Sequence, residues 1–138
     1  MLKGILAISG HSGLFKLIAE TKNNIIVESL STGKRYPVYS SSKISALDDI
    51  AIYSTDEDVP LKSILKTIFD KEKGGSAIRH DSPGEKLKAY FAEVLPDYDR
   101  RRVYVSDMKK VMLWYGILLE KGLLDFSKEE SDNTDSES

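Results

Sequence analysis

The sequence predicts an α+β fold in which a small β-unit is followed by a three-helix unit. Up to Asp58, short runs of β-type residues alternate with turn residues such as glycine, serine and asparagine. After Asp58, apolar residues recur with the period of amphipathic helices, between recognisable start and stop signals. We therefore expect three parts: a small β-domain at residues 1–58, a helical domain at 59–126 and a disordered acidic tail at 127–138.

The β-domain is expected to have about five short strands, at residues 2–8, 14–20, 25–30, 35–39 and 50–53. Gly10, Gly13 and Gly33 suit the turns between them, because glycine adopts positive φ at no steric cost. Pro37 predicts an edge position for the fourth strand, because proline has no N–H to donate to a sheet ladder. Even spacing of short strands favours an SH3-like barrel or strongly bent sheet, and an open, loop-rich sheet is the alternative.

Three amphipathic helices are expected in the helical domain. In the first, apolar residues recur at i, i+3, i+4, i+7 and i+8 from Leu61, which places them on one face. Ser82 and Glu85 match a capping box at the start of the second, and Ser106 is the expected N-cap of the third. The other boundary signals are Pro60 at the first start, and Gly74, Pro96 and Gly122 at the three ends.

The composition is that of a soluble globular protein, with 30% charged and 41% hydrophobic residues. The absence of cysteine excludes disulfides, thiolate metal sites and a cysteine nucleophile. No apolar run approaches the roughly 20 residues of a membrane span, and the first apolar run is too short for a signal peptide. We therefore expect a cytoplasmic protein without membrane contact. Each half alone has a marginal core, so the two are expected to pack together.

Charge is distributed unevenly along the chain. The net charge is −2, yet residues 127–138 contain one lysine and five acidic residues. The remainder is therefore slightly positive, and its positive charge is concentrated in the helical domain. A mild excess does not by itself predict nucleic-acid binding. One hypothesis is that the acidic tail folds back onto the positive patch, in which case deleting residues 127–138 raises the affinity for polyanions.

The basic candidate site is a loop before the third helix together with two lysines on that helix. Its residues are Arg100, Arg101, Arg102, Lys109 and Lys110, with Tyr104 beside them. Guanidinium groups bind phosphates or acidic peptides, and flanking tyrosines stack on nucleobases. Asp97, Asp99 and Asp107 are close in sequence, so a loop held by internal salt bridges is the competing interpretation.

Aromatic residues give a second candidate site. Tyr36, Tyr39 and Tyr53 lie in expected strands, and SH3-like folds bind extended peptides in aromatic grooves. Small barrels also need aromatics in their cores, so packing is the competing interpretation. Trp114 neighbours the buried face of the third helix, where it suits an interface between the two units or between subunits.

No set of residues forms a catalytic or metal-binding signature. The Gly10–Gly13 segment joins two expected strands, whereas a phosphate-binding P-loop needs a longer loop that precedes a helix. The chain has two histidines, His11 and His80, and neither lies in a pattern typical of a triad or a metal site. We therefore expect no catalytic residues, no metal and no cofactor.

Several runs carry a resemblance to a known family. They are residues 1–6, 13–17, 26–30, 32–35 and 49–53 in the first half, and 90–96, 99–100, 102–104 and 106–107 in the second. With these runs the chain resembles an uncharacterised Bacteroidetes family that joins an N-terminal β-domain to a C-terminal helical domain. The resemblance covers nearly all of residues 1–126. It implies a two-part cytoplasmic protein and brings no catalytic residues with it.

The sequence thus favours a non-enzymatic cytoplasmic binding module. The leading hypothesis is contact with nucleic acid, a ribonucleoprotein or an acidic protein through the basic loop. The alternative is a protein–protein interaction adaptor that uses the aromatics of the β-domain or the third helix. An enzyme with a dispersed carboxylate or hydroxyl site has the least support.

Overall fold

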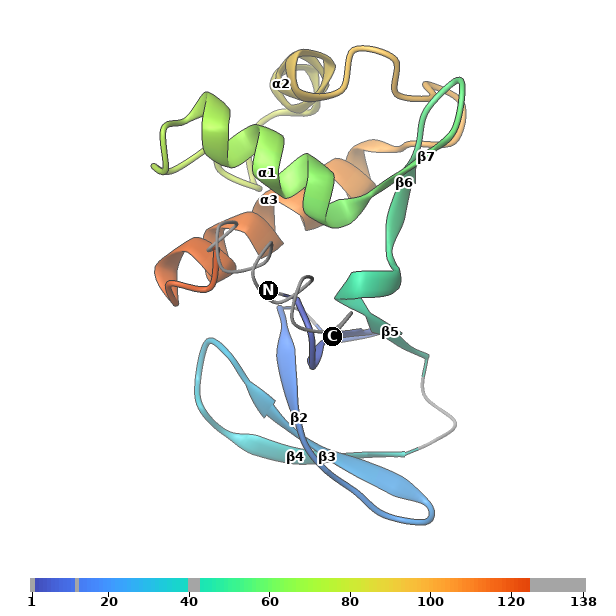
Figure 1. Ribbon diagram of the computed structural model, residues 1–138, viewed down its shortest axis with the longest axis vertical. Helices are drawn as coiled ribbons and strands as arrows, with labels where there is room; N and C mark the ends of the chain where they lie inside the picture. Colours follow the sequence, from blue (N-terminus) through green and yellow to red (C-terminus); the bar gives the residue numbers. More distant parts are fainter. Residues whose placement is uncertain (1, 12, 40–42, 125–138) are drawn as a thin grey trace, which may run out of the picture.

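The computed structural model describes residues 2–11, 13–39 and 43–124, and it has the expected α+β architecture. The expected acidic tail and the loop serines at 40–42 lie outside the described residues. The strands are β1 Ile5–Ile8, β2 Phe15–Glu20, β3 Asn24–Ser29, β4 Arg35–Tyr39, β5 Ile44–Ala46, β6 Ala51–Tyr53 and β7 Asp58–Pro60. The helices are α1 Leu61–Lys71, α2 Gly84–Val94 and α3 Val105–Glu120. Figure 1 shows α1 and α2 on one side of α3 and the strands β2 to β4 on the other.

Five strands form one open antiparallel sheet in the order β4-β3-β2-β1-β5. The edge position predicted from Pro37 is confirmed, because β3 is the one strand that pairs with β4 among the described residues. The strand expected at residues 50–53 is present as β6, but its expected place in the first sheet is wrong. Residues 44–46 pair with β1, whereas residues 51–53 form β6 and pair with β7 in a separate two-stranded sheet.

The reason for this difference is the short 3₁₀ helix at Leu47–Asp49 between β5 and β6. Leu47 is fully buried, and the Ile50 N–H donates to its carbonyl oxygen at 3.2 Å. This anchored turn redirects the chain away from β1 and toward the helices. A three-residue strand that follows a serine run carries too weak a pattern to be recognised.

One hydrophobic core joins the two units. It contains residues of the β-unit such as Leu2, Leu14 and Leu47, packed with residues of the helices such as Phe91 and Leu118. The expectation that the halves pack together is confirmed at this core. A second, smaller cluster of Ile8, Phe15, Val27 and Val38 lies on the other face of the sheet.

Two of the predicted helix caps are wrong. The N-cap of α2 is Pro83 without a side-chain hydrogen bond, so the capping box expected at Ser82 is not formed. The N-cap of α3 is Tyr104 rather than Ser106, because Asp107 already accepts the Tyr104 N–H at 2.9 Å. A carboxylate at this position satisfies an open donor and complements the positive end of the helix.

The end of α3 has the predicted left-handed cap. Gly122 has a φ of 67°, and the Leu123 N–H donates to the Leu118 carbonyl oxygen at 2.9 Å.

Within the described residues, no helix is long and apolar enough to cross a membrane.

Candidate functional site

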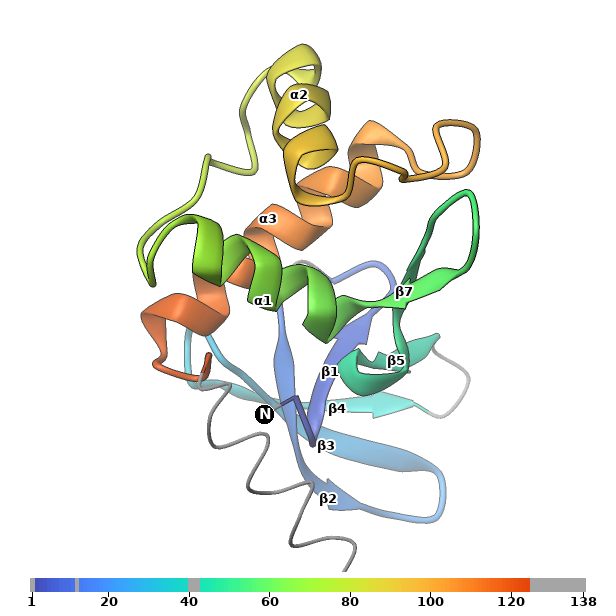
Figure 2. The same cartoon turned by 45° about the horizontal axis from the view of Figure 1, so that its top comes forward.

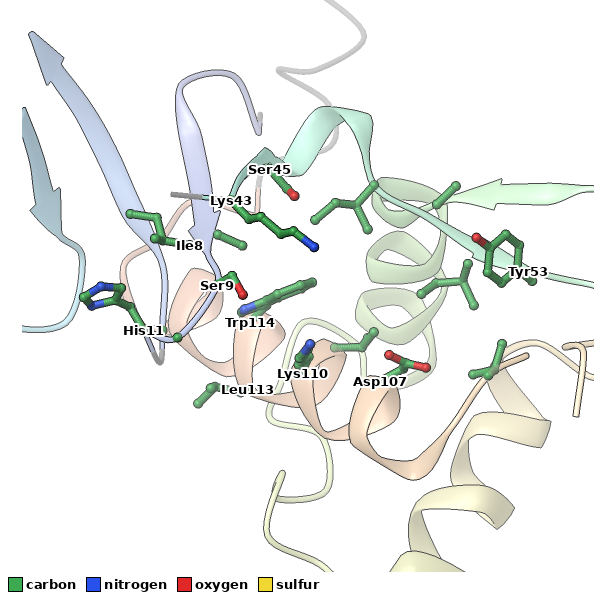
Figure 3. A pocket seen from close by; sticks show the side chains of 18 of the residues that line it. Ile8, Ser9, His11, Lys43, Ser45, Tyr53, Asp107, Lys110, Leu113 and Trp114 are labelled. Atoms are coloured by element: carbon green, nitrogen blue, oxygen red, sulfur yellow. The ribbon is translucent and has the colours of Figure 1, made fainter. Parts of the chain in front are cut away.

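A groove of about 570 Å³ lies where the β-unit meets α3. The end of β1, the start of β5, β6 and the first half of α3 form its walls (Figure 3). Figure 2 shows where the ribbons of β1, β5 and α3 lie in the fold. We call it the inter-unit groove. Its charged side chains are Lys43, Arg102, Asp107 and Lys110. Three cations therefore face one carboxylate.

Lys43 and Lys110 come from different units and reach the same space. Lys43 directly precedes β5, and the Ser9 N–H donates to its carbonyl oxygen at 2.9 Å, which fixes this backbone against the end of β1. Lys110 lies on α3, between Asp107 and Trp114 on the same helix face. Figure 3 shows both ammonium groups directed into the groove. Among the described residues, neither lysine forms an ion pair, so both are available to an anion.

Asp107, the acidic residue of the groove, already has a hydrogen-bond partner. Asp107 accepts the N–H of Tyr104, so its charge is placed at the N-terminal end of α3. Below the charges, the wall is apolar and includes Ile52, Val111 and Trp114, of which Trp114 is 8% exposed. An ion above this wall is less screened by water than one on an open surface.

Arg102 stands at the rim of the groove and is held from two sides. Its Nε donates to Asp99 Oδ2 at 2.9 Å, and its guanidinium lies 4.1 Å from the centroid of the Tyr53 ring. The hydrogen bond from Arg102, followed by that from the Arg101 N–H, lowers the pKa of Asp99. The Arg102 side chain is still 53% exposed, so its guanidinium is oriented but open to a ligand.

The other two arginines of the loop differ from Arg102. Arg100 lies 4.2 Å from the centroid of the Tyr98 ring, and its Nη1 donates to the carbonyl oxygens of Pro96 and Tyr98 at 3.1 and 2.9 Å. Its guanidinium therefore helps to hold the loop. Arg101 is exposed, and its backbone N–H donates to Asp99 Oδ1 at 2.9 Å. The expected internal salt bridge is therefore formed by Arg102. Arg100 is held instead by the Tyr98 ring and two backbone carbonyl oxygens.

The remaining predicted residues are dispersed. Lys109 and Tyr104 are exposed beside the groove, and neither is part of its wall. Tyr36 and Tyr39 lie on the edge strand β4 and are 43% and 65% exposed. The structure therefore brings together Arg102, Lys110, Tyr53 and Trp114 and leaves the other candidates outside the groove.

Sequence reasoning missed Lys43. It follows a serine run and belongs to no motif, and only the pairing of β5 with β1 places it at the groove. Among the described residues, no cluster of three histidine or acidic side chains is suited to a metal ion. The arrangement is suited to holding an anion.

In comparisons with known proteins, two family models match successive parts of the chain. Residues 2–47 match the model of a domain of unknown function, DUF5606, and residues 50–118 match a second, DUF6852. A solution NMR structure of a Bacteroides vulgatus protein, determined by the Northeast Structural Genomics Consortium, is similar over 91% of both chains, with 46% sequence identity and a TM-score of 0.75. A search of curated proteins found no match. Lys43 thus lies in the first matched region and Lys110 in the second.

Proposed function

We propose that this chain, which belongs to the family of the DUF6852 domain and has a DUF5606 domain before it, is a non-enzymatic cytoplasmic module that binds nucleic acid. The observation that carries the proposal is the convergence of Lys43 and Lys110, one from each domain, on one groove without an ion pair among the described residues. A binding site made in this way requires both domains. That requirement gives a functional reason for joining them.

The chemistry of the groove suits phosphate groups. Lysine supplies mobile point charges, whereas the stacked Arg102 supplies a guanidinium in a fixed orientation. Arg101 and Lys109 extend the positive surface beyond the groove. Neutralising about three phosphates of a single strand releases counterions, so log K is expected to fall with log salt with a slope of about −2.

The strand order also supports an SH3-like first unit. The fifth strand returns to pair with the first, and one face of the sheet carries the second apolar cluster. In this proposal the β-unit serves as a rigid wall that presents Lys43.

A fluorescence-anisotropy titration with labelled mixed-sequence RNA and DNA oligomers tests the proposed function. The full chain is titrated at low and near-physiological salt. We expect saturable binding that weakens with salt and is lost in the double variant Lys43→Glu and Lys110→Glu. The matched control is Lys22→Glu with Lys86→Glu, which changes the net charge equally at exposed positions outside the groove. Equal loss in both double variants, or no binding at low salt, would contradict the proposal.

A protein-interaction adaptor is the second candidate, and the position of β4 favours it. Within the part of the chain that the structure describes, no strand pairs with its outer edge, and Tyr36 and Tyr39 are exposed along it. An extended peptide adds to such an edge through main-chain hydrogen bonds. Binding of this kind tolerates salt and depends on the tyrosines, whereas phosphate binding depends on the lysines. Trp114 is buried and offers little surface to a partner.

A further inference from the structure

A second cavity adjoins the inter-unit groove. It measures about 590 Å³ and lies between the sheet face of the second apolar cluster and the α3 residues Leu113 and Ile117. We call it the side chamber. Four lining residues are common to the groove and the chamber, namely Ile8, His11, Gly13 and Leu113. The two spaces therefore meet at a shared boundary, with cations on one side and an apolar floor on the other.

The floor of the side chamber is apolar, but its rim is polar. Phe15, Val27 and Val38 form part of the floor, and Ser29 and Thr32 lie on the rim. Tyr36 and His11 also line the chamber, and the Phe15 ring meets the His11 ring edge to face at a centroid distance of 6.2 Å. A flat ring with apolar faces and polar edges suits such a lining.

The hydroxyl groups of Ser29 and Thr32 on the rim can donate hydrogen bonds to a ligand. The Thr32 N–H donates to Ser29 Oγ at 3.3 Å, and the Lys34 N–H donates to Thr32 Oγ1 at 3.2 Å. Among the described residues, neither hydroxyl donates its own proton. A hydrocarbon chain in the chamber would cover these donors without satisfying them, which costs free energy. A nucleobase offers carbonyl and ring-nitrogen acceptors at its edge.

We propose that the side chamber receives one unpaired base of a single-stranded nucleic acid while its phosphates lie along Lys43, Lys110 and Arg102. This inference rests on the proposed function and adds the class of nucleic acid that it selects. Tyr36, which is 43% exposed at the chamber, provides a ring on which the base stacks. A duplex keeps its bases stacked and paired, so it has no free base to insert.

The test compares three oligomers of equal length: a mixed-sequence single strand, an abasic strand with the same sugar-phosphate backbone, and a duplex. Each is titrated into the full chain at low salt and followed by anisotropy. We expect the base-containing single strand to bind at least about fivefold more tightly than the abasic strand, as stacking of one base predicts. The duplex, which has no free base to insert, is expected to bind more weakly than the base-containing single strand.

The variant Tyr36→Ala locates the effect. It should bring the affinity of the single strand close to that of the abasic strand and leave abasic binding unchanged. Tyr39→Ala is the matched control, because Tyr39 lies on the same strand and is more exposed but does not line the chamber. An equal effect of the two substitutions would overturn the assignment of the chamber.

The remaining outcomes separate the two proposals. Equal binding of abasic and base-containing strands overturns the role of the chamber and leaves phosphate binding intact. Failure of all three oligomers to bind overturns the proposed function itself. Dodecanoate serves as a final probe, since it combines a carboxylate with an apolar chain. Displacement of the single strand by dodecanoate below its micelle-forming concentration, together with equal binding of the abasic strand, would identify an amphipathic anion as the occupant instead.

Discussion

The guanidinium of Arg102 lies 4.1 Å from the centroid of the Tyr53 ring, which joins the loop before α3 to the hairpin of β6 and β7. The backbone reinforces this link, because the Asp99 N–H donates to the Tyr53 carbonyl oxygen at 2.9 Å and Ser54 forms a β-bridge with Tyr98. Arg102 is thus positioned by a second element. The rim of the inter-unit groove has a fixed geometry for this reason.

The substitution Asp99→Asn should lower the free energy of unfolding at neutral pH. It should also reduce the loss of that free energy as the pH falls. Arg102 and the Arg101 N–H lower the native-state pKa of Asp99, so the unfolded chain takes up a proton first as the pH falls. The stabilisation is present above the unfolded pKa of about 4 and is lost as the pH falls through the lower native pKa. Urea unfolding at pH 7 and pH 3 measures this difference. Asp97→Asn, which removes an exposed charge from the same loop, should leave the acid sensitivity as in the natural chain.

The substitution Tyr90→Phe should make the stability of the protein less dependent on pH in the alkaline range. The Tyr90 hydroxyl donates to Glu72 Oε2 at 2.5 Å, linking α2 to the residue after α1. Burial, and then this hydrogen bond, raise the pKa of Tyr90 above its ordinary value. The contribution of the group is complete below the unfolded pKa of about 10 and declines as the pH rises further. At pH 8, Tyr90→Phe should lower the free energy of unfolding by roughly 1 kcal/mol. Between pH 8 and pH 11, the variant should lose less of its free energy of unfolding than the unsubstituted protein does. A parallel decline of both proteins in urea unfolding would refute this account.

Two glycines near the end of α3 should respond oppositely to alanine. Gly122 has a φ of 67°, so Gly122→Ala should destabilise the protein by about 1 to 2 kcal/mol. Gly116 lies inside the helix, and an added Cβ would meet no atom within 4 Å. Gly116→Ala should therefore stabilise the protein by about 0.5 to 1 kcal/mol. Thermal unfolding of both variants measures the contrast, and a change of the same sign at both sites would be inconsistent with it.

The helix-stop signals were more informative than the helix-start signals. Gly122 identified the end of α3 because a left-handed cap has few alternatives to glycine. Ser106 failed as a start because the Asp107 carboxylate, one residue later, supplies the cap to Tyr104. Several polar residues near a helix start compete for one role, and their order alone does not decide among them.

The shared core predicts that the two units unfold together. Leu14 lies in the β-unit, is 1% exposed and belongs to the same cluster as the α3 residue Leu118. Leu14→Ala should cost about 2 to 5 kcal/mol and lower the stability of both units equally. Far-ultraviolet circular dichroism and the fluorescence of Trp114, the single tryptophan, should give coincident urea transitions. Two separate transitions would show that the units are independent.

The candidate site was only partly accessible from sequence. The arginine run and Lys110 stood out because they are clustered in the chain. Lys43 did not, because its role depends on a three-residue strand that pairs with β1 and on the buried turn at Leu47. Arg100 was equally prominent in sequence, yet the ring of Tyr98 and two carbonyl oxygens hold it away from the groove. Sequence shows which charges are present, and tertiary packing decides which of them are free.

Amide chemical-shift mapping can show whether Lys43 and Lys110 contact the same bound nucleic acid. The ¹⁵N-labelled full chain is titrated with a short single-stranded oligomer at low salt. The amides at residues 9–11, 43–45 and 110–114 should shift together along one saturation curve, and Lys43→Glu should weaken the response at 110–114. Shifts confined to β4, or shifts at 110–114 that are indifferent to Lys43→Glu, would contradict this prediction.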